Sequence, residues 1–509
     1  MDFERLYFFF VKLLQFSDTS PFLFTSEVFW IFFTIVLGGF AFVYKRIPLR
    51  NLYLFVISLF FYYRTSGPFL DLLLISCLTN YLCGLAIGKS LSPLKKKLWL
   101  TLSLITNLGI LSYFKYAYFI INLLNQTLNT KYVAVNWLVI WQNEIFGTHN
   151  PVEKIILPIG ISFFTFQAIS YVVDVYRGDV KALKNPLDFG FYLTFFPQLV
   201  AGPIVRAAGF IPQIYQKYQV RKEEFGHALF LIIGGLIKKI IISDYLSINF
   251  VDRVFETPLS YSGIEVLMAI YGYALQIYCD FSGYTDIAIG LGLLMGFRLP
   301  INFNSPYRSA NISEFWKRWH ISLSLWLKDY LYIPLGGNRK GKIRTYLNLM
   351  ITMLLGGLWH GANIRFIIWG GIHGMALCLH RLWKSIFPNL KSTKVTRTFS
   401  IILTFHFVAF AWICFRADDI VTIQEMLYQL THSFFPKNPE LLLPTYSIIL
   451  VLIISGYFLH GFPAQIKEYG RGWFIQLPFI IKISFGILTG ILLYYAMSAG
   501  LQPFIYFRF

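Results

Sequence analysis

Residues 98–123 read LWLTLSLITNLGILSYFKYAYFIINL and decide the class of fold to which this chain belongs. A helix of about 20 apolar residues is long enough to cross the hydrocarbon core of a bilayer. Similar runs recur along the 509 residues, of which 56% are hydrophobic and only 14% charged, against about a quarter charged in soluble domains. A membrane β-barrel would show short alternating strands instead. The sequence therefore predicts an all-α, polytopic membrane protein.

The apolar runs extend over most of the chain. They fall near 28–44, 52–63, 69–87, 98–123, 155–175, 187–205, 226–248, 262–278, 282–297, 345–362, 364–382, 399–415, 444–460 and 476–498. The run at 52–63 is short for a full span, so we expect tilting or local thinning of the bilayer there. No internal repeat or soluble segment interrupts the series. We therefore expect a single integral membrane domain over residues 1–509.

The basic residues mark the ends of these runs. Lys and Arg number 44 against 25 Asp and Glu, for a net charge of +19. In a soluble protein this excess would suggest nucleic acid, but here it fits the positive-inside rule and contacts with membrane lipids. The clusters expected in the cytoplasm lie at 45–50, 89–97, 177–184, 206–222, 339–344, 384–397 and 467–471.

The run at 187–205 differs from the others because basic clusters flank both of its ends. One crossing cannot leave both ends on the same side. The run also contains Pro197, Gly202 and Pro203. Irregular backbone at membrane depth is tolerated only where it is buried in protein or lines a cavity. We therefore predict a re-entrant segment, inside a polar catalytic core that extends over about 155–420.

The first candidate catalytic residue, His320, follows a helix start. Asn311 can act as the N-cap, and Glu314 completes a capping-box-like pattern. At helical spacing Trp316 and His320 share one apolar stripe with leucines further along. A single histidine on such a face is more often a core residue than a catalytic one.

The second candidate, His360, lies in the stretch GGLWHGAN at 356–363, at the end of an apolar run. Ionisable residues within membrane segments are costly and therefore suggest function. The glycines at 356, 357 and 361 permit close backbone approach, either for helix packing or for a substrate channel. A buried histidine beside glycine-mediated helix packing is the alternative interpretation.

Two further patches carry polar groups. The stretch DFSGYTD puts Asp280, Tyr284 and Asp286 in an apolar neighbourhood, where the carboxylates can orient an imidazole or, more simply, pair with Arg298. The stretch PLGGNRKGK at 334–342 is glycine-rich and basic, which suits phosphates, although it lacks the P-loop spacing. Positive-inside anchoring is the simpler interpretation of that second patch.

Signatures of other enzyme classes are missing from the sequence: there is no G-x-S-x-G, HExxH or P-loop. The five cysteines form no CxxC or Cys/His pattern, so no metal site is predicted. Histidines with scattered Asp, Asn and hydroxyl groups fit acyl transfer. A neutral imidazole can remove the proton of an attacking alcohol, while Asn, Trp or backbone N–H donors stabilise the oxyanion.

Because these motifs occur in this order along the chain, the sequence resembles the membrane-bound O-acyltransferase (MBOAT) family. The resemblance is to the branch that contains the alginate O-acetylation membrane protein. The resemblance is densest from about 155 to 420. It is carried by FFPQLVAGPI (195–204), DFSGYTD (280–286), NFNSPY (302–307), EFWKRWH (314–320), DYLYIPLGGN (329–338), GGLWHG (356–361), FRA (415–417) and PFIY (503–506).

The resemblance implies a ring of tilted helices around a thin core, with a tunnel from the cytoplasm to the outer face. It also implies that His360 and His320 are both necessary and that one of them is the general base. Further residues are expected at the tunnel or substrate site: Trp316, Trp319, Trp359, Asn363, Asp280, Asp286 and Tyr284. Arg339, Lys340 and Lys342 are the expected contacts for the phosphates of an acyl-CoA.

The activity implied by the resemblance is half of a two-part system in a bacterial inner membrane. The chain would take an acetyl group from cytosolic acetyl-CoA, with no bound cofactor, and pass it outward. A periplasmic or cell-surface esterase-like partner of the SGNH/GDSL type would then place it on an exopolysaccharide such as alginate.

Other functions remain open at the level of the residues. A transporter or flippase explains the spans and buried polar groups equally well, but not the polar content gathered around two histidines and several tryptophans. A lipid-linked glycosyltransferase usually needs a metal-binding or catalytic carboxylate cluster at a membrane face. Asp280 and Asp286 are weak candidates for such a cluster. A structural scaffold would not need costly buried polar groups.

Overall fold

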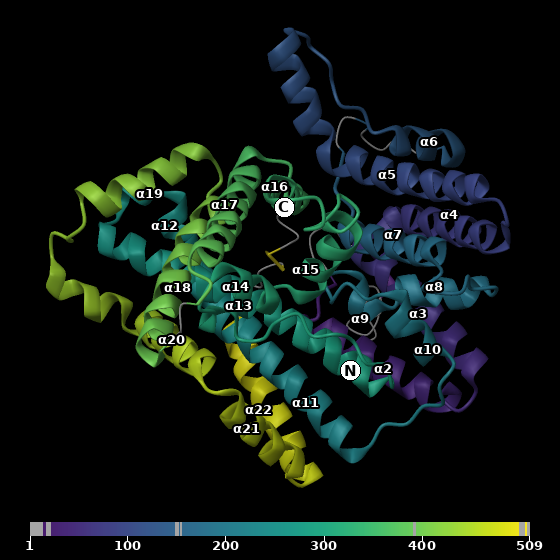
Figure 1. Cartoon of the computed structure of the whole chain (residues 1–509). Coiled ribbons are helices and arrows are strands. Elements are labelled where there is room, and N and C mark those ends of the chain that lie inside the picture. Colours follow the sequence, from purple (N-terminus) through teal and green to yellow (C-terminus); the bar gives the residue numbers. More distant parts are fainter. Residues whose placement is uncertain are drawn as a thin grey trace.

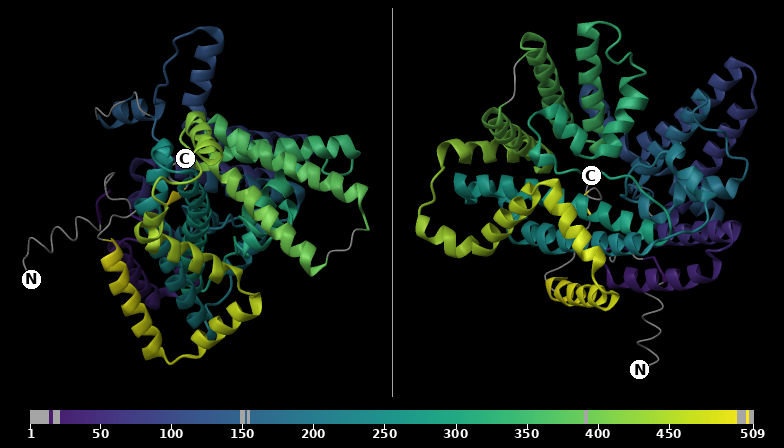
Figure 2. Two further views of the ribbon diagram at one scale, coloured as in Figure 1. Left: turned by 90° about the vertical axis from the view of Figure 1, so that its left-hand side faces the viewer. Right: turned by 60° about the horizontal axis from the view of Figure 1, so that its bottom comes forward.

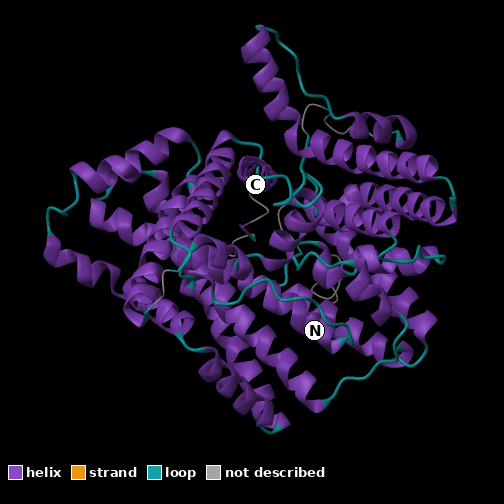
Figure 3. Cartoon of the chain, viewed as in Figure 1, coloured by secondary structure: helices purple, strands orange, loops and turns teal. Residues whose placement is uncertain are grey.

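The computed structural model describes residues 14–16, 22–147, 152, 155–389, 393–497 and 504–505. Within this part of the chain every regular element is a helix (Figure 3), so the all-α prediction is confirmed. The α-helices are α2 (Glu27–Val43), α3 (Ile47–Ser66), α4 (Leu70–Lys89), α5 (Pro93–Leu128), α6 (Trp137–Phe146), α7 (Ile161–Arg177), α8 (Pro186–Thr194), α9 (Phe196–Leu199), α10 (Ala207–Ile214), α11 (Lys222–Leu236), α12 (Asp252–Glu256), α13 (Gly263–Leu294), α14 (Ile312–Arg318), α15 (Ile321–Leu327), α16 (Lys342–His360), α17 (Ile364–Ile386), α18 (Lys394–Arg416), α19 (Ile420–His432), α20 (Leu442–Gly461), α21 (Ala464–Gln476) and α22 (Phe479–Met497). Short 3₁₀ turns are η1 (Gly67–Phe69), η4 (Pro258–Ser260), η5 (Pro306–Arg308) and η7 (Pro439–Leu441), and π-helical stretches are η2 (Ile237–Asp244), η3 (Ser247–Val251) and η6 (Lys328–Tyr332).

Polar residues begin many of these helices for a local reason. The side chains of Asn185, Asn311, Asn363 and Asp419 each accept a hydrogen bond from an amide two or three residues further on. These amides have no partner inside the helix, so the capping oxygen stabilises the first turn. The helix start predicted at Asn311 is confirmed.

Two short helices of the polar core, α14 and α15, have 7 residues each and lie in the middle of the molecule (Figure 1). The pair α16 and α17 packs on one side of them, and the long helices α11 and α13 pack against each other on another. Helix α7 contacts both α4 and α5. The two views in Figure 2 show long helices leaning in different directions around this centre.

Five helical segments of the described residues are long and apolar enough to cross a membrane, and one bent pair would make a sixth. The five are Ile47–Lys89, Pro93–Leu128, Lys222–Glu256, Lys394–Arg416 and Pro439–Gly461. The chain is therefore a multi-pass membrane protein. Among the residues that the structure describes, fewer helices are long and apolar enough to span than there are apolar runs in the sequence.

Two of the run boundaries predicted from sequence are wrong. Helix α3 has 20 residues, about 30 Å, so the short run at 52–63 needs no thinning of the bilayer. It is longer than the run because Arg50 lies within it, buried, and donates to the carbonyl oxygens of Ile214 (2.6 Å) and Gln216 (2.9 Å). The runs at 262–278 and 282–297 form one continuous helix, α13.

The structure supports the re-entrant prediction for residues 187–205. The run divides into α8, of 9 residues, and α9, of 4, both too short to cross a bilayer. The flanking residues Arg177 and Arg206 meet at one place, because Arg177 donates to the backbone oxygen of Asp329 (3.1 Å) and Arg206 forms an ion pair with its carboxylate (2.6 Å). Both guanidinium groups also lie over the ring of Tyr330. The two ends of the run therefore lie on the same side of the molecule.

Buried polar side chains connect two helices in the amino-terminal third of the chain, although its composition is mostly apolar. Asn80 of α4 accepts hydrogen bonds from Ser103 (2.7 Å) and Asn107 (2.8 Å) of α5, and all three side chains are buried. These contacts fix the rotation of α5 relative to α4. They thereby fix which residues of α5 face the polar core.

Candidate active site

His320 lies at a break between two helices. The prediction that it continues the helix begun at Asn311 is wrong: α14 ends at Arg318, and α15 begins at Ile321. His320 itself has φ 42° and ψ 56°, the left-handed conformation that side chains with a Cβ rarely adopt. The break turns the imidazole into the core, where it is fully buried.

Asn302 holds this break in place. Its backbone oxygen accepts from the amide of Ile321 (3.0 Å), and its side-chain oxygen accepts from the amide (3.2 Å) and the hydroxyl (2.6 Å) of Ser322. The oxygen of Ser322 in turn accepts from the amide of Ile204, in the re-entrant segment (3.0 Å). The turn that carries His320 is thus tied to two other parts of the core. Asn302 was noted in the sequence only as part of a motif.

His360 is the last residue of α16, and it is 3% exposed. The ring of Trp359 connects the two histidines, with its centroid 4.9 Å from the ring of His360 and 6.1 Å from that of His320. The structure therefore brings together the two histidines that the sequence places 40 positions apart.

Tryptophans and phenylalanines surround this pair. His360 contacts Trp369 (5.2 Å between centroids) and Phe415 (5.1 Å). Trp316 contacts Trp369 at 5.7 Å, and Trp319 is buried beside Trp412 at 4.9 Å. The predicted tunnel residues Trp316 and Trp319 thus belong to the aromatic wall around the site. Aromatic walls keep water out and strengthen the electrostatic interactions inside a site.

The glycines around His360 serve helix packing. A Cβ on Gly357 would overlap the backbone oxygen of Phe366, and a Cβ on Gly370 would overlap that of Met353. A Cβ on Gly361 would overlap the ring of Phe366. Glycines at these positions let α16 and α17 approach closely, which favours the packing interpretation of the GGLWHG stretch over a channel.

Lys115 is the residue of this site that sequence reasoning missed. It lies on α5, and its ammonium donates to the backbone oxygens of Trp359 (2.6 Å) and His360 (3.0 Å). Together with Trp359, His360, Ser162 and Phe163 it lines a cavity of about 40 Å³. The sequence contained the information needed to find Lys115. A lone lysine within an apolar run is as unfavourable in a membrane as a histidine, and therefore equally suggests function.

The carboxylates of DFSGYTD face lysines. Asp280 pairs with Lys239 at 2.5 Å, and Asp286 pairs with Lys238. Lys239 also binds Asp244 at 2.7 Å, and all three members of that cluster are buried. The ion-pair interpretation is confirmed, although the predicted partner Arg298 is wrong.

The carboxyl-terminal segment reaches the same cluster. The amide of Ile505 donates to Asp280 (2.9 Å), and Phe504 contacts the rings of Phe281 and Tyr284. Tyr284 is buried and stacks on Phe24 at 4.5 Å. Pro503 and Tyr506 of the PFIY motif lie outside the described residues. Asp280 and Tyr284 therefore join distant segments of the fold.

Asn363 and the basic stretch lie at opposite ends of α16. Asn363 follows His360 and caps α17 by accepting from the amide of Arg365 (3.1 Å). Arg339, Lys340 and Lys342 are exposed at the start of α16. The 19 residues of α16 rise about 27 Å from first to last, so these cations are far from His360.

A larger pocket, of about 440 Å³, reaches the turn of His320 from another direction. Ile321 and Ser322 contribute to its lining, together with Ile204 of the re-entrant segment and the guanidinium-bearing residues Arg206 and Arg298. The pocket therefore combines an apolar lining with two cationic side chains. The segment 200–206 contributes to both spaces, since Val200 lines the small cavity with His360 and Ile204 lines the larger pocket.

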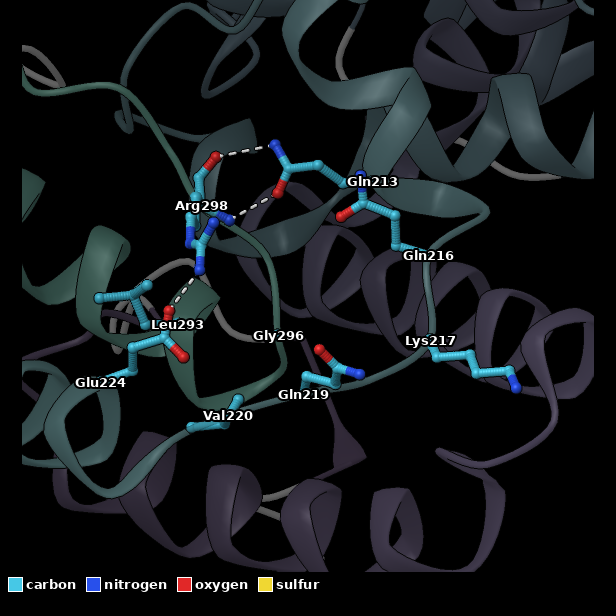
Figure 4. Close-up of a pocket in the computed structure, with 9 residues that line it drawn as sticks. All are labelled: Gln213, Gln216, Lys217, Gln219, Val220, Glu224, Leu293, Gly296 and Arg298. Carbon is cyan, nitrogen blue, oxygen red and sulfur yellow. Dashed lines mark hydrogen bonds and ion pairs between the residues drawn. The ribbon is translucent and has the colours of Figure 1, made fainter.

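Arg298 also lines a neighbouring polar pocket of about 540 Å³ (Figure 4). Its backbone exchanges two hydrogen bonds with the side chain of Gln213, at 2.8 and 3.1 Å, and its guanidinium pairs with Glu224. Lys217 adds a further cation to this pocket. Among the described residues, no group of three or more His, Cys, Asp or Glu side chains is arranged to hold a metal ion.

Two buried histidines joined by a tryptophan, in a helical chain that crosses the membrane, form the candidate active site. Residues 48–417 match the MBOAT, membrane-bound O-acyltransferase family, so the chain belongs to that family and is an acyltransferase. The match covers both histidine motifs, α5 with Lys115 and the FRA stretch.

Three relatives show the breadth of the family around this chain. A probable alginate O-acetylase AlgI of Pseudomonas syringae pv. tomato is 42% identical over 404 residues, 78% of this chain and 73% of the relative. A peptidoglycan O-acetyltransferase of Helicobacter pylori is 34% identical over 515 residues, 92% of this chain and 93% of the relative. A teichoic acid D-alanyltransferase of Bacillus subtilis is 30% identical over 285 residues, 52% of this chain and 70% of the relative.

Proposed function

We propose that this chain, as one integral membrane domain of a bacterial inner membrane, transfers an acetyl group from cytosolic acetyl-CoA towards an extracytoplasmic polysaccharide. The observation that carries the proposal is the pair of buried histidines joined by Trp359, beside a cavity that His360 lines. Relatives named for alginate and peptidoglycan support a polysaccharide as the final acceptor. An SGNH-type partner outside the membrane places the group on that polymer.

The reaction is a balanced acyl transfer. The oxygen of an acceptor hydroxyl attacks the thioester carbonyl carbon. At the same time the neutral imidazole of His360 accepts the proton of that hydroxyl. A C–O bond forms, the C–S bond breaks, and the leaving sulfur takes the proton back from the imidazolium. His360 suits the base because it lines the cavity with Ser162 and Phe163. His320 contacts the same Trp359 ring at 6.1 Å between centroids and forms part of the aromatic enclosure.

The donor has two candidate binding regions. The 440 Å³ pocket has an apolar lining for an acyl-pantetheine arm and the cations Arg206 and Arg298 for phosphates. It ends at Ser322, two positions after His320. The basic stretch with Arg339, Lys340 and Lys342 is exposed, which favours a contact with the outer phosphates of the coenzyme or with lipid.

Transfer of label from radiolabelled acetyl-CoA tests the proposed function, in membranes that also contain the polysaccharide and a candidate partner. We expect transfer with the wild type and none above background with His360→Ala or His320→Ala at matched expression. His432→Ala is the control, because His432 is exposed on α19. Equal transfer by all variants would remove the histidines from the chemistry, and no transfer by the wild type would overturn the proposal.

The same assay separates the two donor regions. If phosphates bind at the pocket, Arg206→Gln with Arg298→Gln raises the KM for acetyl-CoA with little change in kcat. The triple change Arg339→Gln, Lys340→Gln and Lys342→Gln then leaves the KM near that of the wild type. The opposite result would place the coenzyme phosphates at the start of α16.

A further inference from the structure

Lys115 holds the end of α16 on which His360 lies. Its ammonium binds the backbone oxygens of Trp359 and His360, and the neighbouring Tyr116 donates to the oxygen of Leu358 (2.8 Å). The last carbonyls of a helix have no partner inside the helix and carry partial negative charge, so a cation is favourable there. Two consecutive residues of α5 therefore fix the last turn of α16.

Helix capping uses only part of the hydrogen-bonding capacity of Lys115. A charged ammonium inside a membrane segment is costly, and the hydroxyl of Tyr116 serves the adjacent carbonyl without charge. Lys115 also lines the cavity together with His360, and its ammonium lies 5.7 Å from the centroid of the Trp359 ring. An ammonium has three N–H donors, and the carbonyls of Trp359 and His360 use two of them.

We propose that Lys115 is a catalytic residue whose ammonium stabilises the negative charge formed on the acyl oxygen during transfer. The inference rests on the proposed function. As the acceptor oxygen bonds to the thioester carbon, the carbonyl π electrons move to its oxygen, and the third N–H of Lys115 donates to this oxyanion. The electrons return when the C–S bond breaks. Lys115 neither gains nor loses a proton, while His360 carries the acceptor proton to the sulfur.

Three substitutions separate this role from helix capping. Lys115→Gln keeps hydrogen-bond donors without the charge, Lys115→Met removes both, and Lys115→Arg keeps both in another shape. Loss of one oxyanion donor costs on the order of 10²–10³ in kcat. We expect a loss of that size for Lys115→Met and Lys115→Gln, with the KM for acetyl-CoA within about threefold, and partial recovery in Lys115→Arg.

Lys482 provides the matched control. It is buried on α22 and donates to the backbone oxygen of Ile475, at the end of α21 (2.6 Å). Lys482→Met removes a helix-end contact of the same kind away from His360, so kcat is expected to stay at the wild-type level. The thermal midpoint of each purified variant shows whether it is folded. If Lys115→Met does not fold, Lys115→Gln and Lys115→Arg carry the comparison.

The outcomes distinguish this inference from the proposed function. If the wild type transfers acetyl groups, His360→Ala does not, and a folded Lys115→Gln keeps the wild-type kcat, then Lys115 is a helix cap only and the inference is wrong. If the wild type itself transfers nothing, the proposed function fails first. A loss of kcat in Lys115→Gln with an unchanged thermal midpoint supports the catalytic role.

Discussion

The side-chain oxygen of Asn302 accepts two hydrogen bonds from Ser322, one from its hydroxyl at 2.6 Å and one from its backbone amide at 3.2 Å. Ser322 follows His320 by two positions, and its own oxygen accepts from Ile204. One buried amide side chain thus joins the histidine turn, the re-entrant segment and the wall of the larger pocket. The contact couples the donor side of the proposed reaction to His320.

Asn302→Ala is expected to lower both stability and turnover. It leaves the amide and hydroxyl of Ser322 without their acceptor in a buried place, which costs roughly 1–3 kcal/mol. The thermal midpoint should fall and kcat should drop by about tenfold or more as the turn loosens. Asn304→Ala is the control, since Asn304 is exposed on the same segment. Equal effects of the two changes would contradict the assigned role.

The left-handed backbone of His320 predicts a difference in stability between two variants that both lack the imidazole. Both His320→Ala and His320→Gly remove the imidazole, but only alanine keeps a Cβ at φ 42°. That conformation costs an L-residue about 1–2 kcal/mol. His320→Gly should therefore unfold at the higher temperature, as measured by thermal denaturation of the purified proteins in detergent. A more stable alanine variant would show that the turn relaxes to another conformation.

The buried cluster of Lys239 with Asp280 and Asp244 predicts a large effect on folding. Lys239→Met leaves two buried carboxylates without their cation, which costs about 3–5 kcal/mol. We expect a strong loss of monodisperse protein on size exclusion. The double change Lys239→Met with Asp280→Asn should recover part of it, because it removes one uncompensated charge.

Lys238→Met is the comparison for that cluster. Lys238 is the preceding residue, and its pair with Asp286 is partly exposed, with 23% and 27% of the side chains accessible. Water compensates charges in such a pair, so the loss should be clearly smaller. Similar losses for the two lysines would mean that burial does not set the energy of these pairs.

Gly357→Ala tests the packing of α16 on α17. The added Cβ would overlap the backbone oxygen of Phe366, and backbone cannot move aside as a flexible side chain can. Overpacking of this kind costs typically 1–3 kcal/mol, and here it would also displace His360. The thermal midpoint and kcat should both fall. Gly109→Ala on α5, where a Cβ meets no atom within 4 Å, should change neither.

The candidate site was predictable in part. His320 and His360 could be selected because ionisable groups in apolar runs are costly, and the same argument applied to Lys115 would have found it. The helix break at His320 was not predictable, since the local pattern of Trp316 and His320 favours a continuous helix. Asn302 overrides that pattern from a segment outside it. Asp280 was expected to pair with Arg298, yet it pairs with Lys239, while Arg298 pairs with Glu224.

Run length and composition alone predict a helical protein that crosses the membrane, because the transfer of apolar side chains into lipid adds residue by residue and needs no partner. The re-entrant segment also follows from local charge and proline content. The grouping of Lys115 with His360, 245 positions apart, does not. Contacts of that kind depend on how α5 packs against the core, and their energies arise only when the helices meet. The chemistry of the site therefore rests on tertiary packing, while its membrane setting rests on sequence.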